Sequence, residues 1–203
     1  MTDTQLAGFP QEHFNPWFMG DAINEFPDQL IYEKSHITNL IEKYTSPNGV
    51  FGTKAQFDQI ADFVGLSRLE NFFPTSLKYI FIQRGDKIGQ AVSLARAEQT
   101  DQWMSGQAIQ REPQYNYFQI RSCLREIKLQ EKGWEIYFME RGIKPYRVNY
   151  EELAANPQPV ILGALDYLGI KRPAGFQVPT PRIQKQGDSI SEEWIARYAR
   201  SES

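Results

Sequence analysis

The sequence predicts an α/β fold with a parallel β-sheet, and three observations support this prediction. Short apolar, β-branched or aromatic runs bounded by Gly, Pro or Asn occupy residues 49–54, 78–83 and 145–150 and predict three strands. Segments with helical periodicity lie between these runs. Strands that alternate with helices pair in parallel through right-handed crossovers. No repeat or Gly-, Ser- or Pro-rich linker divides the chain, so we expect one domain, residues 1–203.

Helices are expected at residues 30–45, 55–65, 86–103, 115–142 and 159–170, with a last helix over 191–200. The helix over 115–142 carries apolar residues at helical spacing, and Gly142 is its expected C-cap before Pro145. Ser189 and Glu192 predict a capping box that opens the last helix.

Composition excludes several classes of protein. With 22 basic and 25 acidic side chains the net charge is −3, which argues against nucleic-acid binding and requires a local cluster for any anionic ligand. No apolar stretch reaches 18 residues and the N-terminus does not resemble a signal peptide, so we expect no membrane span and a cytoplasmic protein. The single Cys123 excludes an intrachain disulfide and is expected in the core. His13 and His36 lack further ligands at metal-binding spacing, so no metal is expected.

The ends of the predicted strands carry polar and charged residues. Ligands of parallel α/β sheets bind beyond the carboxyl ends of the strands, where Lys54, Arg84 and Glu151 are expected. In the helix after Arg84, Ser93 shares a face with Gly89, Arg96 and Thr100. A guanidinium, a hydroxyl and free N–H groups at a helix start suit a phosphate or sulfate dianion. The alternatives are ordinary ion pairs, of Arg84 with Asp86 and of Lys54 with Asp58.

Residues 84–103, R-G-D-K-I-G-Q-A-V-S-L-A-R-A-E-Q-T-D-Q-W, resemble the 3′-phosphate-binding segment of the Stf0-type sulfotransferases. Four further segments resemble parts of this family in the same order, namely residues 8–14, 48–59, 148–153 and 185–198. The resemblance implies a three-layer sandwich with the P-loop nucleotide-hydrolase-like sulfotransferase fold. It also implies transfer of a sulfuryl group from 3′-phosphoadenosine 5′-phosphosulfate (PAPS) to a sugar hydroxyl; the family's founding activity is trehalose 2-sulfation.

The resemblance assigns roles to individual residues. Arg84 and Ser93 would bind the 3′-phosphate of PAPS, and Lys185 and Gln186 would contact the nucleotide. Glu12 would be the general base that accepts the proton of the sugar hydroxyl; the alternative is a solvated loop carboxylate. PAPS is the implied co-substrate, without a metal, and a small carbohydrate or glycolipid is the implied acceptor. Homodimers are usual in the family.

One family feature is not found in these 203 residues. Family members begin with an apolar strand and an Arg-Ser-Gly-Ser-Thr-like turn that binds the 5′-phosphosulfate at a helix N-terminus, whereas this sequence starts at M-T-D-T-Q-L-A-G-F-P. We therefore expect a chain truncated at its N-terminus, with a missing first strand, an exposed apolar edge and impaired or no activity. The alternative function is a non-catalytic module that binds PAPS or its product 3′,5′-diphosphoadenosine (PAP), or that assists assembly. A P-loop kinase is disfavoured because no G-x-x-x-x-G-K-[ST] motif occurs.

Overall fold

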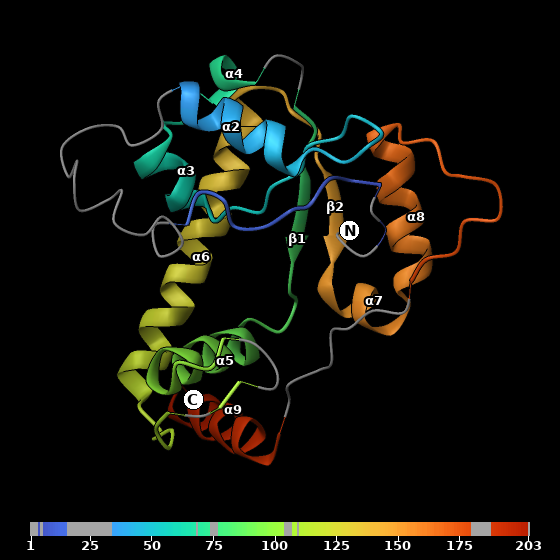
Figure 1. The fold of residues 1–203 in the computed structure, drawn as a ribbon. Helices are drawn as coiled ribbons and strands as arrows, with labels where there is room; N and C mark the ends of the chain where they lie inside the picture. Colours follow the sequence, from blue (N-terminus) through green and yellow to red (C-terminus); the bar gives the residue numbers. More distant parts are fainter. Residues whose placement is uncertain are drawn as a thin grey trace.

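The computed structural model describes residues 4, 6–15, 34–67, 69–73, 77–103, 107–108, 110–179 and 188–202. Its sheet consists of two parallel strands, β1 (Ile80–Gln83) and β2 (Tyr146–Asn149), paired from Ile80 opposite Tyr146 to Gln83 opposite Asn149 (Figure 1). The expected α/β fold with a parallel sheet is therefore confirmed, and both strands lie within the predicted runs.

Helices cover both faces of this sheet (Figure 1). On one face Phe81 packs against Phe138 of the long helix α6 (Tyr117–Glu140), with ring centroids 5.5 Å apart. On the other face the hydroxyl of Tyr146 donates a 3.4 Å hydrogen bond to Val160 O in α8 (Pro157–Leu168). The remaining described helices are α2 (Lys34–Tyr44), α3 (Phe57–Phe63), α4 (Leu69–Phe72), α5 (Lys87–Thr100), α7 (Tyr150–Ala155) and α9 (Ser189–Ser201).

Helix α6 joins two apolar clusters because it is long enough to cross both. Its N-terminal half packs with α5 and α9 around Val92, Ile120 and Trp194, and the expected core residue Cys123 is buried there. Its C-terminal half packs with α2, α3 and β1 around Ile37, Val64 and Phe138. The helix ends as predicted: Gly142 has φ +62°, and the N–H groups of Gly142 and Ile143 donate to Met139 and Phe138, which is a Schellman motif.

The strand predicted at residues 49–54 is wrong, because this segment forms a loop. Its hydrogen bonds are isolated: Val50 O accepts from Ser46 N–H at 2.9 Å, and Lys54 N–H donates to Gln11 O at 2.9 Å. Gly52 lies against Ala7 O, where a Cβ would come within 2.6 Å. Loop-to-loop packing therefore satisfies this backbone, and among the described residues no strand lies beside it to form a ladder.

Two predicted boundaries also need correction. Tyr150 and Glu151 were expected to end the strand at 145–150, but they begin α7, because the Asn149 side chain accepts from Glu152 N–H and caps a helix there. The cap of α9 is Asp188 and not Ser189: the Asp188 carboxylate accepts from Ser191 N–H at 2.9 Å. Helix α4 was not predicted. Inside β1, the side chain of Ile82 is 54% exposed.

Candidate functional site

A tight turn connects the carboxyl end of β1 to α5. Asp86 caps the helix, its Oδ1 accepting from Gly89 N–H at 2.8 Å, and Lys87 N–H donates to Gly85 O at 2.9 Å. The sequence analysis expected free backbone N–H groups at the start of this helix to bind the anion. This expectation is corrected, because the N–H groups of Lys87 and Gly89 already donate hydrogen bonds within the turn.

Glu151 ties the turn to the end of the neighbouring strand. Its carboxylate accepts from Gly85 N–H at 3.0 Å and from Asp86 N–H at 3.1 Å. These hydrogen bonds lower the pKa of Glu151 below its ordinary value, and the bond from Gly85 N–H has the largest effect. The ends of β1 and β2 therefore meet at one edge of the sheet, with Arg84 and Glu151 together there as predicted.

The guanidinium of Arg84 lies over the first turn of α5. It is 5.5 Å from the centre of the Tyr150 ring, and Nη2 is 3.4 Å from Asp86 Oδ2, so the pairing with Asp86 weighed from the sequence does occur. A Cβ on Gly89 would come within 2.9 Å of Arg84 Nη2, so glycine allows this close approach. The contact with Asp86 uses one of five guanidinium N–H donors, which leaves capacity for an oxyanion.

Ser93 is one helical turn beyond Gly89 on the same side of α5 and is half-buried. In the described part of the chain its hydroxyl makes no hydrogen bond. Arg84 and Ser93 therefore lie along one face of α5 at the carboxyl-end edge of the sheet.

Arg96, three residues after Ser93, forms an ion pair with Asp188 that the sequence analysis did not predict. Its guanidinium donates to both carboxylate oxygens of Asp188, at 2.6 and 2.9 Å, and also to Ser191 Oγ. The Arg96 hydrogen bonds lower the pKa of Asp188 to about 2. The pair fixes the start of α9 against α5, beside Ser93.

Glu12 lies in the N-terminal segment that packs on the loop at 49–54, next to Gln11, whose carbonyl accepts from Lys54 N–H at 2.9 Å. Its Oε2 accepts from the Asn15 side chain at 2.8 Å. The neighbouring His13 ring is 4.3 Å from the Tyr44 ring and 5.9 Å from the Phe51 ring, and burial lowers the pKa of His13. Among the described residues no hydrogen bond or ion pair connects Glu12 with Arg84 or Ser93.

The remaining predictions concern Lys185, Gln186 and Lys54, a metal site and a membrane span. Lys185 and Gln186 lie outside the described residues. Lys54 was expected beside Arg84 at the carboxyl-end edge of the sheet, but this is wrong, because residues 49–54 form a loop and Lys54 does not end a strand. Its side chain is exposed, and within the described ranges it makes no ion pair with Asp58. The described residues also contain no group of three His, Cys, Asp or Glu side chains placed to hold a metal ion. None of the described helices is both long and apolar enough to cross a membrane.

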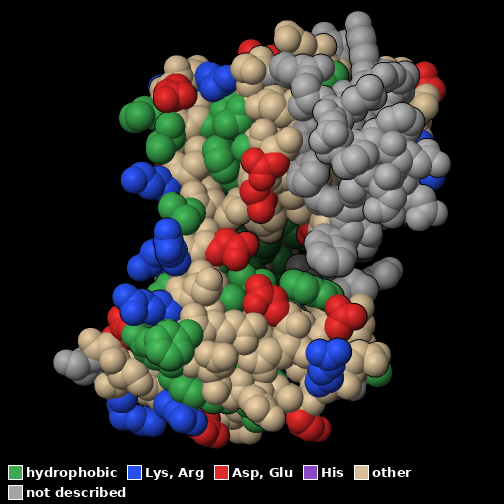
Figure 2. All heavy atoms as spheres, turned by 90° about the vertical axis from the view of Figure 1, so that its left-hand side faces the viewer, with side chains coloured by type: hydrophobic (Ala, Val, Ile, Leu, Met, Phe, Trp, Pro, Cys, Tyr) green, Lys and Arg blue, Asp and Glu red, His purple; other side chains and the backbone are tan. Residues whose placement is uncertain are grey.

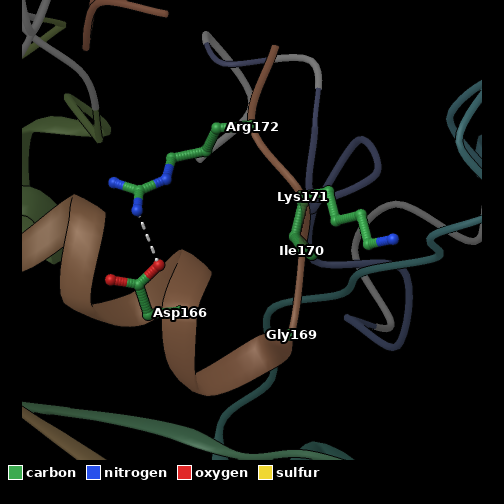
Figure 3. Close-up of a pocket in the computed structure, with 5 residues that line it drawn as sticks. All are labelled: Asp166, Gly169, Ile170, Lys171 and Arg172. Atoms are coloured by element: carbon green, nitrogen blue, oxygen red, sulfur yellow. Dashed lines mark ion pairs between the residues drawn. The ribbon is translucent and has the colours of Figure 1, made fainter. Parts of the chain in front are cut away.

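A surface hollow lies at the other end of the sheet (Figure 3). It is lined by Asp166, Gly169, Ile170, Lys171 and Arg172. Arg172 pairs with Asp166 at 2.9 Å, and Lys171 points away from that pair. Lys78, just before β1, donates to Tyr167 O at 2.9 Å, so this hollow is near the amino ends of the strands. Because ligands of parallel sheets bind at the carboxyl ends, we place the candidate site at Arg84 and Ser93.

The structure is that of an α/β protein with a parallel sheet, and Arg84 lies just beyond the carboxyl end of β1. The family of such proteins follows from comparison: the model of the Stf0 sulphotransferase family matches residues 1–201, and the chain belongs to this family. The family expected from the five sequence segments is thus confirmed.

Two relatives of this chain carry the name trehalose 2-sulfotransferase. The protein of Mycobacterium tuberculosis (strain ATCC 35801 / TMC 107 / Erdman) is 27% identical over 235 residues, covering 96% of this chain and 86% of the relative. The protein of Mycolicibacterium smegmatis (strain ATCC 700084 / mc(2)155) is 31% identical over 234 residues, covering 97% and 86%. Both alignments are longer than the 203 residues here, so the relatives carry extra residues within the aligned region.

Proposed function

We propose that this sulfotransferase transfers a sulfuryl group from PAPS to a hydroxyl of a small carbohydrate, with trehalose or a trehalose glycolipid as the first acceptor to test. Membership of the Stf0 family and two trehalose 2-sulfotransferase relatives support the reaction and the acceptor class. The observation that carries the donor assignment is the close approach of Arg84 to Gly89, on the face of α5 that continues to Ser93.

Arg84 and Ser93 suit the 3′-phosphate of PAPS. The guanidinium presents several N–H donors from the end of β1, and the Ser93 hydroxyl supplies a further donor on the same face. Arg84 is 25% exposed and rests on Tyr150, so its orientation is restricted before the ligand arrives. ATP and ADP lack a 3′-phosphate, so these two residues would select PAPS over common adenine nucleotides.

Lys185 and Gln186 are proposed to contact the nucleotide from the C-terminal side. Asp188 follows Lys185 by three residues and is held by Arg96, one turn beyond Ser93. That anchor supports the proposal, because a chain of three residues reaches at most about 11 Å.

Glu12 is proposed as the general base. A carboxylate that accepts the proton of the attacking hydroxyl typically contributes about 10²- to 10⁴-fold to the rate. We therefore expect Glu12→Gln to lower kcat by at least tenfold while the Kd for PAP stays unchanged. An unchanged kcat would leave Glu12 as a solvated carboxylate held by Asn15.

Calorimetric titration with PAP and ADP tests the donor site. PAP should bind at least tenfold more tightly than ADP, and Arg84→Ala should weaken PAP binding by about 2 to 4 kcal/mol, since the dianion loses a charge-assisted hydrogen-bond partner. Arg172→Ala is the matched control, because it removes a guanidinium paired with Asp166 at the opposite end of the sheet. Equal affinities for PAP and ADP, or equal effects of the two substitutions, would contradict the proposal.

We also propose that the 203 residues alone bind PAP but turn over PAPS slowly. Their sequence offers no glycine-rich turn to orient the 5′-phosphosulfate, and misplacing reacting groups by about 1 Å can cost a hundredfold. The test compares this polypeptide with one extended by a family-type strand, turn and helix; the extension should raise both turnover and thermal stability. Turnover near one per second without the extension, an ordinary enzyme rate, would refute it.

A homodimer and a cytoplasmic location complete the proposal. Light scattering at several protein concentrations tests the dimer, and cell fractionation tests the location.

A further inference from the structure

The outward side of α6 combines basic and large apolar side chains. Arg121, Arg125, Lys128 and Lys132 are all exposed and follow the spacing i, i+4, i+7 and i+11, which places them on one side of the helix. Phe118, Leu129, Ile136 and Met139 fall on the same side and are 78%, 56%, 40% and 74% exposed. We call these eight residues the outer face of α6. Figure 2 looks onto the flank of the molecule that carries α6, and Lys and Arg side chains are stacked with hydrophobic ones along one border of it.

Helix α6 carries four acidic residues, and among the described residues none of them pairs with a basic residue of the outer face. Glu140 is exposed at the C-terminal end of the helix, eight residues after Lys132. Glu131 pairs with Lys87 of α5, and Glu135 makes a two-bond pair with Arg147 of β2 at 2.6 and 2.7 Å. Glu126 is on another side of the helix, where burial and then the nearby carboxylates of Glu98 and Asp58 raise its pKa.

Within the described residues none of the four basic side chains of the outer face makes an ion pair. The chain carries a net charge of −3, so this local excess of positive charge does not reflect its overall composition.

From this combination we propose that the outer face of α6 docks onto the surface of a membrane rich in anionic phospholipid. Basic side chains there meet the headgroup charges, and bulky apolar side chains enter the boundary between headgroups and acyl chains. The helix has 24 residues and is therefore about 36 Å long, and it would lie in the plane of the surface.

Other occupants fit the outer face less well. A second copy of the chain packed around a two-fold axis would place basic residues opposite basic residues, since the four of them extend over three turns. A nucleic acid would match the charges, but Phe118 and Met139, each at least 74% exposed, would have no apolar partner along a phosphate backbone. An anionic lipid surface satisfies both kinds of side chain.

The proposal is independent of the catalytic assignment, so its test needs no enzyme activity. The full 203-residue chain is floated with vesicles of phosphatidylcholine alone and of phosphatidylcholine with about 30% phosphatidylglycerol, at low and high salt. The variants are Lys128→Gln/Lys132→Gln for charge and Phe118→Ser/Leu129→Ser for the apolar part. The controls are Lys43→Gln/Lys171→Gln and Ile190→Ser, which make the same changes at exposed positions on α2, after α8 and on α9. Circular dichroism verifies that each variant is folded.

The expected result is binding to the anionic vesicles, at least tenfold tighter than to the neutral ones and weakened by salt. The double lysine variant should bind about 10- to 30-fold more weakly, near fivefold for each charge removed. The apolar variant should bind more weakly at every salt concentration, and the controls should stay within twofold of the parent. Four results would overturn the proposal: equal binding to both vesicle types, equal losses in the controls, a dimer in solution that Phe118→Ser/Leu129→Ser dissociates, or a short RNA that binds as tightly as the vesicles.

Discussion

The ion pair between Arg96 on α5 and Asp188, the N-cap of α9, joins two residues that are 92 positions apart in the sequence. The Arg96 side chain is only 15% exposed. Asp188 has two structural roles, because its carboxylate pairs with the Arg96 guanidinium and also caps α9. The substitution Asp188→Asn separates the two roles. Asparagine is as good an N-cap as aspartate, so the substitution removes the charge while it leaves an acceptor for Ser191 N–H.

The expected loss follows from the pKa of Asp188, which is about 2 in the folded protein against an ordinary 3.8. The full pKa difference of Asp188 would correspond to roughly 2 kcal/mol in the free energy of unfolding. Because the Asp188 side chain is 47% exposed, screening by solvent reduces this to about 1 kcal/mol. A depressed pKa in the folded state stabilises the protein at pH values above the unfolded value. The contribution is therefore complete above about pH 4 and is lost as the pH falls through about 2.

Urea denaturation followed by tryptophan fluorescence measures this difference, with buried Trp194 on α9 as a local reporter. At pH 7 the variant should be less stable by about 1 kcal/mol, and the gap should narrow as both proteins are acidified from pH 4 to pH 3. Asp166→Asn is the control, because it breaks a more exposed pair with Arg172 and should cost less than about 0.5 kcal/mol. A variant as stable as the parent at pH 7, or a gap that does not change with pH, would refute the reasoning.

Two glycines give further predictions. In Gly89→Ala the new Cβ would meet Asp86 Oδ2 at 2.0 Å and Arg84 Nη2 at 2.9 Å. The loss of the cap and the gain in helix propensity are each about 1 kcal/mol and largely offset one another. Stability should therefore change little while PAP affinity falls at least tenfold by calorimetry; unchanged affinity would show that Arg84 does not bind PAP from this position. In Gly133→Ala the Cβ would lie 2.5 Å from the Phe57 ring, and urea denaturation should show a net loss of about 1 kcal/mol from overpacking. Equal or higher stability would mean that the ring moves aside at no cost.

Residues close in the sequence were predicted better than residues brought together by the fold. The runs that form β1 and β2 are apolar and bounded by turn residues, so composition alone located them. The segment 49–54 also has apolar residues bounded by turn residues, but it includes Gly49 and Gly52 and forms a loop. A strand also needs a neighbour with which to pair, and the composition of a segment does not report that neighbour. Asp188 was missed as the cap of α9 for a similar reason, since its partner Arg96 is 92 residues away.

In the candidate site, too, residues close in the sequence were predicted better than residues far apart. Arg84 and Ser93 are nine residues apart, one just after a strand and one on the helix that follows. Helical periodicity predicted that Ser93 shares a face with Gly89, and the close approach of Arg84 to Gly89 became visible only in the structure. Glu12 is far from both in the sequence, and its described contacts are with Asn15. Its assignment as the base therefore depends on the resemblance to the family, whereas Arg84 and Ser93 are supported by geometry as well. If Glu12→Gln leaves kcat unchanged while Arg84→Ala abolishes PAP binding, the donor site stands and the base must be sought elsewhere in the chain.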